Sequence, residues 1–380
     1  MLLVSSALAA APVCGTPLVL DALRGFSAPP HPNMLVPPSH LDGRPTLRAK
    51  GKSIYGRHYE HYVETTNFTI DWSDADIDSD VADAAGEALE GAWTAFLREQ
   101  DWTPPVSSDT YKIWVVLDPD LGMTGYTTEY YTDDFPEGYP VIYLDPSWAS
   151  QPAFFGALAA HEFMHTLQYA LRDWDGTDAS EAWYWEASAN WASELADPDR
   201  DGYQYASEWY ADQADLSYDS MTGYHQYGIF VFNAWLEQVQ TGAGGMKAVW
   251  DLSAVDDSNW RTLLEESTGA DATDLWGGFT GAYANGQLAE SDLYTAVTTE
   301  GALQDGVSGD LPELGTHYYR VRADARVVAD GDVVLADSDE HGDVVDVQAG
   351  DILGVTAVDA SSYVLTVETD ADTDADSDTD

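Results

Sequence analysis

The sequence is poor in cysteine, in basic residues and in long apolar runs. Its single cysteine, Cys14, excludes a disulfide within the chain. Lysine and arginine together number 15 against 67 aspartates and glutamates, which gives a formal net charge of −52. A surface of this sign repels nucleic acid and anionic membranes, so we expect no nucleic-acid partner. Beyond the first residues, no stretch is long and apolar enough to predict a membrane span.

The excess of acidic residues has a consequence for stability. Like charges push the folded chain apart most strongly at low ionic strength, where screening is weak. We therefore predict a halophilic acidic surface, in a protein adapted to salt. With 380 residues, the chain is also long enough for two or three domains, each with its own core.

Both ends of the chain differ in composition from its middle. Residues 1–25 begin with an apolar run that ends in small residues, as a signal peptide does, but the run is short and lacks a basic region before it. The segment is therefore signal-like but atypical. Residues 26–58 are rich in proline, glycine and polar residues, and indicate a linker or propeptide-like extension. Residues 370–380 alternate aspartate with threonine, alanine or serine, so we expect a disordered acidic tail there.

The most informative motif is H-E-x-x-H, formed by His161, Glu162 and His165. Residues 153–171 around it contain no proline and are rich in helix formers, so we expect the motif to lie within a helix. Positions i and i+4 share one helix face, which lets both imidazoles reach one metal ion. The glutamate between them can then approach a water bound to that ion. The other interpretation, two core histidines and a surface glutamate, leaves Glu162 charged on a mostly apolar helix.

The motif requires a third ligand, because a catalytic zinc site takes three protein ligands and keeps a fourth position for water. A metzincin would have its third histidine where this chain has Leu171, and a glycine where it has Gln168. We therefore do not expect that arrangement. A second helical stretch, rich in tryptophan, follows at residues 183–194 and carries Glu186, 21 positions after His165.

These two stretches resemble the gluzincin metallopeptidases, and in particular secreted metallopeptidases of myxobacteria and their relatives. The resemblance covers roughly residues 60–290. It implies that Glu186 is the third zinc ligand, and that Asn190, one helical turn later, supports a histidine ligand by a hydrogen bond. The family commonly has aspartate at the latter position. The competing third ligands, which we rank below Glu186, are Glu194, Glu181 and Asp178.

The residues before the motif predict the parts of a sheet. Strands are expected at 61–72, 111–117 and 140–145, and an amphipathic helix at 79–101. In gluzincins the strand beside the active-site helix is a sheet edge, and extended substrate adds to it through main-chain hydrogen bonds.

The resemblance and the strand pattern together predict an α+β fold. A zincin-like catalytic domain would consist of a mixed sheet with the active-site helix, at residues 59–180, and a mainly helical subdomain at 181–290. Six short strands between residues 318 and 367, divided by Gly, Asp and Ser turns, then indicate a small β-sandwich at 295–369.

The expected chemistry follows from the metal site. Zinc held by His161, His165 and Glu186 would lower the pKa of its bound water toward about 7. Glu162 would take the water proton as general base and later pass it to the departing amine.

The resemblance also implies a hydrogen-bond donor for the oxyanion, a tyrosine or histidine downstream of the third ligand. His225 and Tyr227 are our candidates, without an order between them. Both stand at the start of an apolar helix that we expect at residues 229–239.

Residues 197–208 fit D-x-[DN]-x-[DN]-G-x5-E, the pattern of a calcium-binding loop. Against this hypothesis, position eight is the polar Gln204, and no second loop is evident to pair with the first. A Ca²⁺ ion here would have a structural role. Its ligands would be Asp197, Asp199, Asp201, Tyr203 and Glu208.

The sequence thus predicts a secreted or cell-surface bacterial endopeptidase, a zinc-dependent monomer that acts on polypeptide substrates. One alternative is a catalytically silent surface or adhesion protein on a zincin scaffold. The intact Glu162 argues against it, because loss of the base is the simplest way to silence such a site. A second alternative is a metallo-aminopeptidase, for which no motif that would hold a free N-terminus is evident.

Overall fold

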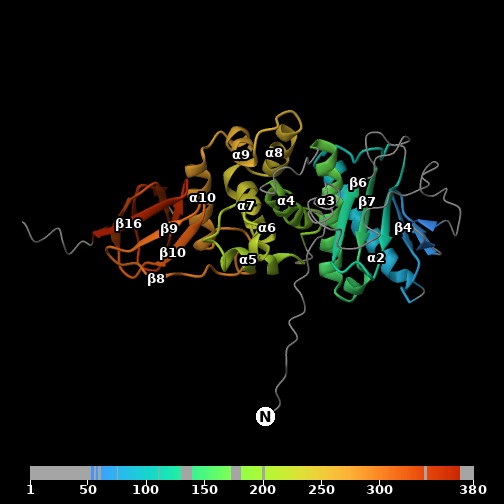
Figure 1. The fold of residues 1–380 in the computed structure, drawn as a ribbon, viewed down its shortest axis with the longest axis horizontal. Helices are drawn as coiled ribbons and strands as arrows, with labels where there is room; N and C mark the ends of the chain where they lie inside the picture. The colour runs from blue at the N-terminus through green and yellow to red at the C-terminus, as the bar shows by residue number, and fades with distance from the viewer. Residues whose placement is uncertain are drawn as a thin grey trace, which may run out of the picture. The chain divides into compact units, whose positions relative to one another are not determined.

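A computed structural model describes residues 53–54, 57–58, 61–74, 76–109, 111–129, 139–172, 181–198, 202–337 and 340–368. The predicted signal-like segment, most of the linker and the acidic tail lie outside these residues. The chain divides into two compact units. The first comprises residues up to 176 together with 192–202, and the second comprises residues 177–191 together with those from 203 onward. Both contain helices and strands (Figure 1), so the α+β prediction is confirmed.

The first unit contains a mixed five-stranded sheet of order β3-β4-β5-β7-β6. The two outer pairs of strands are antiparallel, and the two inner pairs, β4 with β5 and β5 with β7, are parallel. The bounds are β3 (His61–Glu64), β4 (Phe68–Trp72), β5 (Ile113–Leu117), β6 (Gly125–Glu129) and β7 (Pro140–Leu144). A separate pair is formed by β1 (Ser53–Ile54) and β2 (Arg57–His58).

One strand prediction needs correction, and one strand was missed. The single strand expected at 61–72 is a hairpin, because the chain turns after Glu64, where the Thr65 amide donates to the Phe68 carbonyl. The edge strand β6 was not predicted. Its sequence, GYTTE, has one large apolar residue and therefore carries no alternating apolar pattern.

Two helices of the first unit pack on each other and on the sheet. α2 (Ser79–Trp93) is capped by the Asp78 side chain, and a short π-helical segment, η2 (Thr94–Glu99), continues it. α3 (Pro152–Leu171) follows the short helix η3 (Pro146–Ser150) and begins with proline, which is favourable in a first helical turn. Phe163 of α3 packs edge-on against Phe68 of β4, and α3 also contacts β6 and β7.

The second unit is helical in its first part. α4 (Ala182–Ala196) begins in this unit, and its tryptophan-rich start packs against Trp250 and Trp260. The remaining helices are η5 (Gln204–Ala206), α5 (Ser207–Ala211), η6 (Thr222–Tyr224), α6 (His225–Gly228), α7 (Phe230–Trp235), η7 (Leu236–Gln240), α8 (Gly245–Ser253), α9 (Trp260–Thr268) and α10 (Ala272–Ala284). The helix expected at 229–239 is therefore divided into α7 and η7.

The second unit ends in two sheets that share one apolar core. One sheet has the order β13-β12-β15-β10-β8 and the other β14-β11-β16-β9. α10 packs on β12, β13 and β15 of the first sheet. The strands are β8 (Gly301–Ala302), β9 (Ser308–Leu311), β10 (Thr316–Arg320), β11 (Ala325–Asp330), β12 (Val333–Ala336), β13 (His341–Gly342), β14 (Val344–Val347), β15 (Ile352–Ala357) and β16 (Ser361–Glu368).

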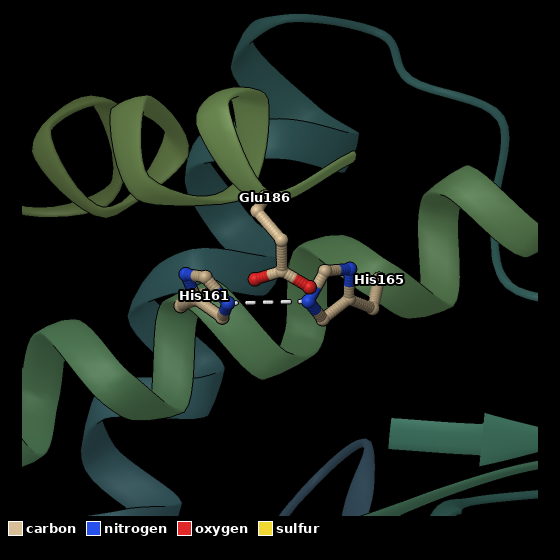
Figure 2. A group of neighbouring side chains, drawn as sticks. All are labelled: His161, His165 and Glu186. Carbon is tan, nitrogen blue, oxygen red and sulfur yellow. Dashed lines mark hydrogen bonds between the residues drawn. The ribbon is translucent and has the colours of Figure 1, made fainter. Parts of the chain in front are cut away.

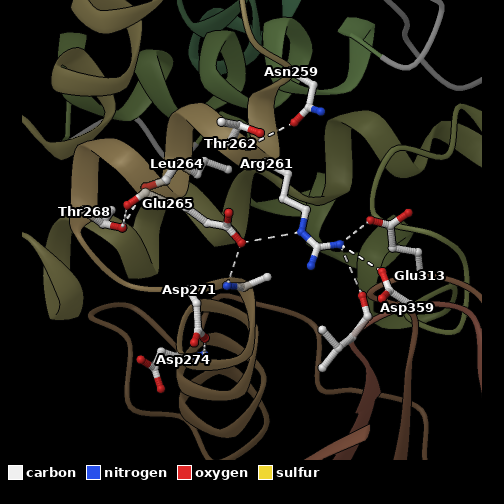
Figure 3. Close-up of polar contacts among 12 residues, drawn as sticks. Asn259, Arg261, Thr262, Leu264, Glu265, Thr268, Asp271, Asp274, Glu313 and Asp359 are labelled. Atoms are coloured by element: carbon white, nitrogen blue, oxygen red, sulfur yellow. Dashed lines mark hydrogen bonds and ion pairs between the residues drawn. The ribbon is translucent and has the colours of Figure 1, made fainter. Parts of the chain in front are cut away.

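An arginine ties α9 to the loops of these sheets. One guanidinium nitrogen of Arg261 lies 2.5 Å from a Glu313 oxygen and 3.3 Å from an Asp359 oxygen. A second nitrogen lies 3.6 Å from Glu265, one turn further along α9 (Figure 3). One of the few basic residues therefore faces three carboxylates at this junction.

Among the residues that the structure describes, no helix combines the length and the apolar character that crossing a bilayer requires.

Candidate metal centre

The H-E-x-x-H motif lies in the buried second half of α3. His165 and Glu162 are 0% exposed and His161 is 4% exposed, so the motif is shielded from bulk water. The helical repeat places the two imidazoles one turn apart, and their Nε2 atoms are 3.1 Å apart. Two nitrogens bound to one zinc ion at about 2.0–2.1 Å in tetrahedral geometry would be separated by about 3.3 Å. The spacing of the two rings therefore suits a shared ion.

Glu186 of α4 completes this group. One nitrogen of each histidine and one Glu186 oxygen all lie within 4.8 Å of one another. Figure 2 shows the carboxylate directed at the gap between the two rings. Glu186 is 0% exposed, so it does not serve to solvate its helix. The described competing ligands, Glu181 and Glu194, do not join the group, and Asp178 lies outside the described residues.

Gln168, one turn beyond His165 on α3, orients the second histidine. Its Oε1 atom lies 2.6 Å from His165 Nδ1. Because an amide oxygen only accepts, His165 donates from Nδ1, and its Nε2 keeps a lone pair directed at the group. Sequence reasoning considered Gln168 only as a departure from another pattern. Its spacing of three residues from a ligand on the same helix was the signal that could have identified it.

The described hydrogen bond of Asn190, expected to support a histidine, goes elsewhere. Its side-chain nitrogen donates to the Tyr227 carbonyl at 3.0 Å and so joins α4 to α6. A role of Asn190 toward a histidine therefore stays a prediction, whereas Gln168 lies within hydrogen-bond distance of His165.

The side chain of Glu162 lies against the edge strand β6. The Thr127 hydroxyl is 2.9 Å from Glu162 Oε2 and 2.7 Å from the Glu162 carbonyl oxygen. Gly125, two residues earlier on the strand, leaves space for the carboxylate, since a Cβ atom there would lie 3.0 Å from Oε1. Neither residue was a candidate from the sequence, because β6 itself was not predicted.

The candidate oxyanion donors both belong to α6 and are buried. His225 packs against Tyr210, with ring centroids 5.9 Å apart, and Tyr227 packs against Trp209 and Tyr224. Burial lowers the pKa of His225 to about 4, and a backbone contact with Ser220 opposes part of that shift. The histidine is thus neutral at pH 7. The oxyanion role of either residue stays a prediction.

Two of the predicted calcium ligands, Asp199 and Asp201, lie outside the described residues. Of the remaining expected ligands, Glu208 is exposed on α5, and the Tyr203 carbonyl accepts a hydrogen bond from the Ala206 amide. Gly202, the glycine of this pattern, packs closely on α3. A Cβ atom there would lie 2.5 Å from the Ala153 carbonyl oxygen.

Comparison with known proteins gives a family but no activity. The chain belongs to a family of unknown function, DUF6055, whose profile matches residues 48–325. The match includes α3, α4 and α6, and ends where β11 begins. No curated protein sequence matches this chain.

Proposed function

We propose that this protein is a zinc-dependent hydrolase of peptide bonds, a secreted endopeptidase with a zincin-like catalytic region. The single observation that carries the proposal is the convergence of His161, His165 and Glu186, with Glu162 placed between the two histidines on the same helix. The resemblance to gluzincins in these two helices supports it further.

The donor set fits a metal ion of the zinc type. Two imidazole nitrogens and one carboxylate oxygen are the protein ligands of a common catalytic zinc site. The Gln168 contact selects the His165 tautomer that a metal requires. Two histidines and one carboxylate also suit iron, so the identity of the ion is a matter for metal analysis. When bound, zinc lowers the pKa of a water toward about 7 and polarises a carbonyl group.

The residues of the chain would supply the remaining steps. Glu162 would accept the proton of the attacking water and hand it to the departing amine, which is general acid–base catalysis by one carboxyl group. His161, His165 and Glu186 would hold the ion, and the burial of all three keeps competing water away from them. A donor from α6, His225 or Tyr227, would complete stabilisation of the oxyanion.

The proposal is tested by metal content and casein hydrolysis of the purified protein. We expect about one zinc per chain, and activity that a chelator removes and zinc restores. Glu162→Gln should keep the metal and reduce hydrolysis about 10²- to 10⁴-fold. Full activity in that variant would remove the general-base assignment.

Two glutamates of α4 provide a matched pair for the ligand assignment. Glu186→Gln should lower the zinc content, whereas Glu194→Gln, a buried glutamate outside the group, should retain it. A protein that binds no metal and hydrolyses no casein would favour the silent adhesion protein instead.

A further inference from the structure

The edge strand β6 presents two different faces to its surroundings. Side chains alternate along a strand, so Gly125 and Thr127 point to one side and Tyr126 and Thr128 to the other. Tyr126 stacks on its register partner Tyr143, with ring centroids 4.4 Å apart. This stack fixes the register of β6 and thereby directs residues 125 and 127 toward α3, which packs on the strand.

Thr127 contacts Glu162 at two points. Its hydroxyl lies 2.7 Å from the carbonyl oxygen and 2.9 Å from Oε2 of that residue. A threonine hydroxyl carries one hydrogen, which these two acceptors share. Because both acceptors belong to one residue, this shared contact relates the carboxylate to the backbone of α3. All of these groups are buried, so water does not compete for the contacts.

Gly125 provides the space for the other carboxylate oxygen. A Cβ atom at this position would lie 3.0 Å from Glu162 Oε1 and 3.2 Å from Glu162 Cγ. It would also lie 2.9 Å from the Tyr143 carbonyl oxygen on the neighbouring strand. The Tyr143 oxygen belongs to the backbone, so an added methyl group would displace the strand at this point as well as the glutamate.

We propose that β6 positions the general base: Thr127 holds one carboxylate oxygen of Glu162, and the absent side chain of Gly125 admits the other. Thr127 is a positioning residue that acts through Glu162. This inference rests on the proposed function, and it gives the edge strand a role in catalysis beyond any contact with substrate.

The test compares neighbouring threonines of β6. Thr127→Val keeps the shape but removes the hydroxyl, Thr127→Ser keeps the hydroxyl, and Thr128→Val makes the same change on the opposite face. Thr128 is an apt control, since it is buried and its hydroxyl has no hydrogen-bond partner among the described residues.

We expect Thr127→Val to lower kcat roughly ten- to a hundredfold, the cost of a misplaced catalytic group, with KM within a few-fold and zinc content unchanged. Thr127→Ser should recover most of kcat, and Thr128→Val should match wild type. Wild-type kcat in Thr127→Val would overturn the inference, and so would an equal loss in Thr127→Ser, which would assign the effect to the methyl group.

A second measurement keeps the inference testable without turnover. Crystal structures of wild type and Thr127→Val should show the Glu162 carboxylate displaced only in the variant. An unmoved carboxylate would contradict the inference even in a protein that lacks peptidase activity. A wild type without metal or hydrolysis would refute the proposed function, whereas a working enzyme indifferent to Thr127→Val would refute the positioning role alone.

Discussion

Helix α3 and the surroundings of Arg261 differ in the burial of their polar groups and in the partners of those groups. On α3, His165 and Glu162 are fully buried, and each has a hydrogen-bond contact with a neutral group, the Gln168 amide and the Thr127 hydroxyl. Around Arg261 the partners are carboxylates that water reaches, with Glu313 39% and Asp359 70% exposed. Short, directional contacts in a dry environment set precise positions, whereas charges in water give attraction that salt screens.

The difference between these two regions indicates where a functional site can form in so acidic a chain. In a chain with a net charge of −52, long-range attraction between carboxylates and the few cationic side chains acts mainly at the surface. A metal centre depends more on ligand atoms held in fixed positions than on a long-range electrostatic field. Hydrogen bonds from neutral side chains hold ligand atoms in position without adding charge. The following predictions test this contrast, from the largest expected effect to the smallest.

The first concerns His225, a buried histidine whose pKa is lowered to about 4, mainly by burial. Between pH 4 and 6.5 the unfolded chain binds a proton at this residue and the folded chain does not, so stability rises with pH across that window. The lowered pKa corresponds to a loss of about 3 kcal/mol in the free energy of unfolding by pH 4. Urea unfolding from pH 4 to 7 should show that the free energy of unfolding depends less steeply on pH in His225→Gln than in wild type. Parallel curves for the two proteins would disprove the assignment.

The second prediction asks which residue orients a metal ligand. Gln168→Leu removes the partner of His165 Nδ1 and should weaken zinc binding about 10- to 100-fold, as measured by competition with a chelating dye. Asn190→Ala breaks the contact of α4 with the Tyr227 carbonyl, and we expect lower thermal stability with little change in zinc affinity. Equal losses of affinity would support the role predicted for Asn190 from the sequence.

The smallest effect is expected at the exposed charges. Arg261→Met should cost roughly 1 kcal/mol of unfolding free energy at low salt, and less in 1 M NaCl. Lys247→Met is the control, because Lys247 has one described partner, Asp251, and the change in net charge is the same. Its cost should be about 0.3–0.5 kcal/mol, typical of a pair one turn apart on a helix. A cost for Arg261→Met that is independent of salt would contradict the contrast with α3.

The helical half of the site could be predicted because its geometry is local. His161, Glu162 and His165 share one helix, and a helix fixes the relation of residues four apart whatever surrounds it. The helix α3 was expected at 153–171 and is observed at Pro152–Leu171. Six strands of the C-terminal sheets were predicted from apolar runs between turn residues, and three short ones, β8, β9 and β13, were not.

The remaining contacts depend on sheet order and helix packing, which no local pattern encodes. Thr127 lies 35 positions from Glu162, and the two meet because β6 is the edge strand beside α3. Glu186 was implied by resemblance, but that it lies within 4.8 Å of two histidines is a property of the tertiary structure.

By itself, the sequence determined the α+β class, the net charge of −52 and one helix face with two imidazoles and a glutamate. Only the tertiary structure decided what surrounds that face. Chain segments far apart in the sequence are brought together by burial of apolar surface, which is not directional. The Thr127 hydroxyl and the space at Gly125 therefore come to lie beside Glu162 only once the strands have paired and α3 has packed on them.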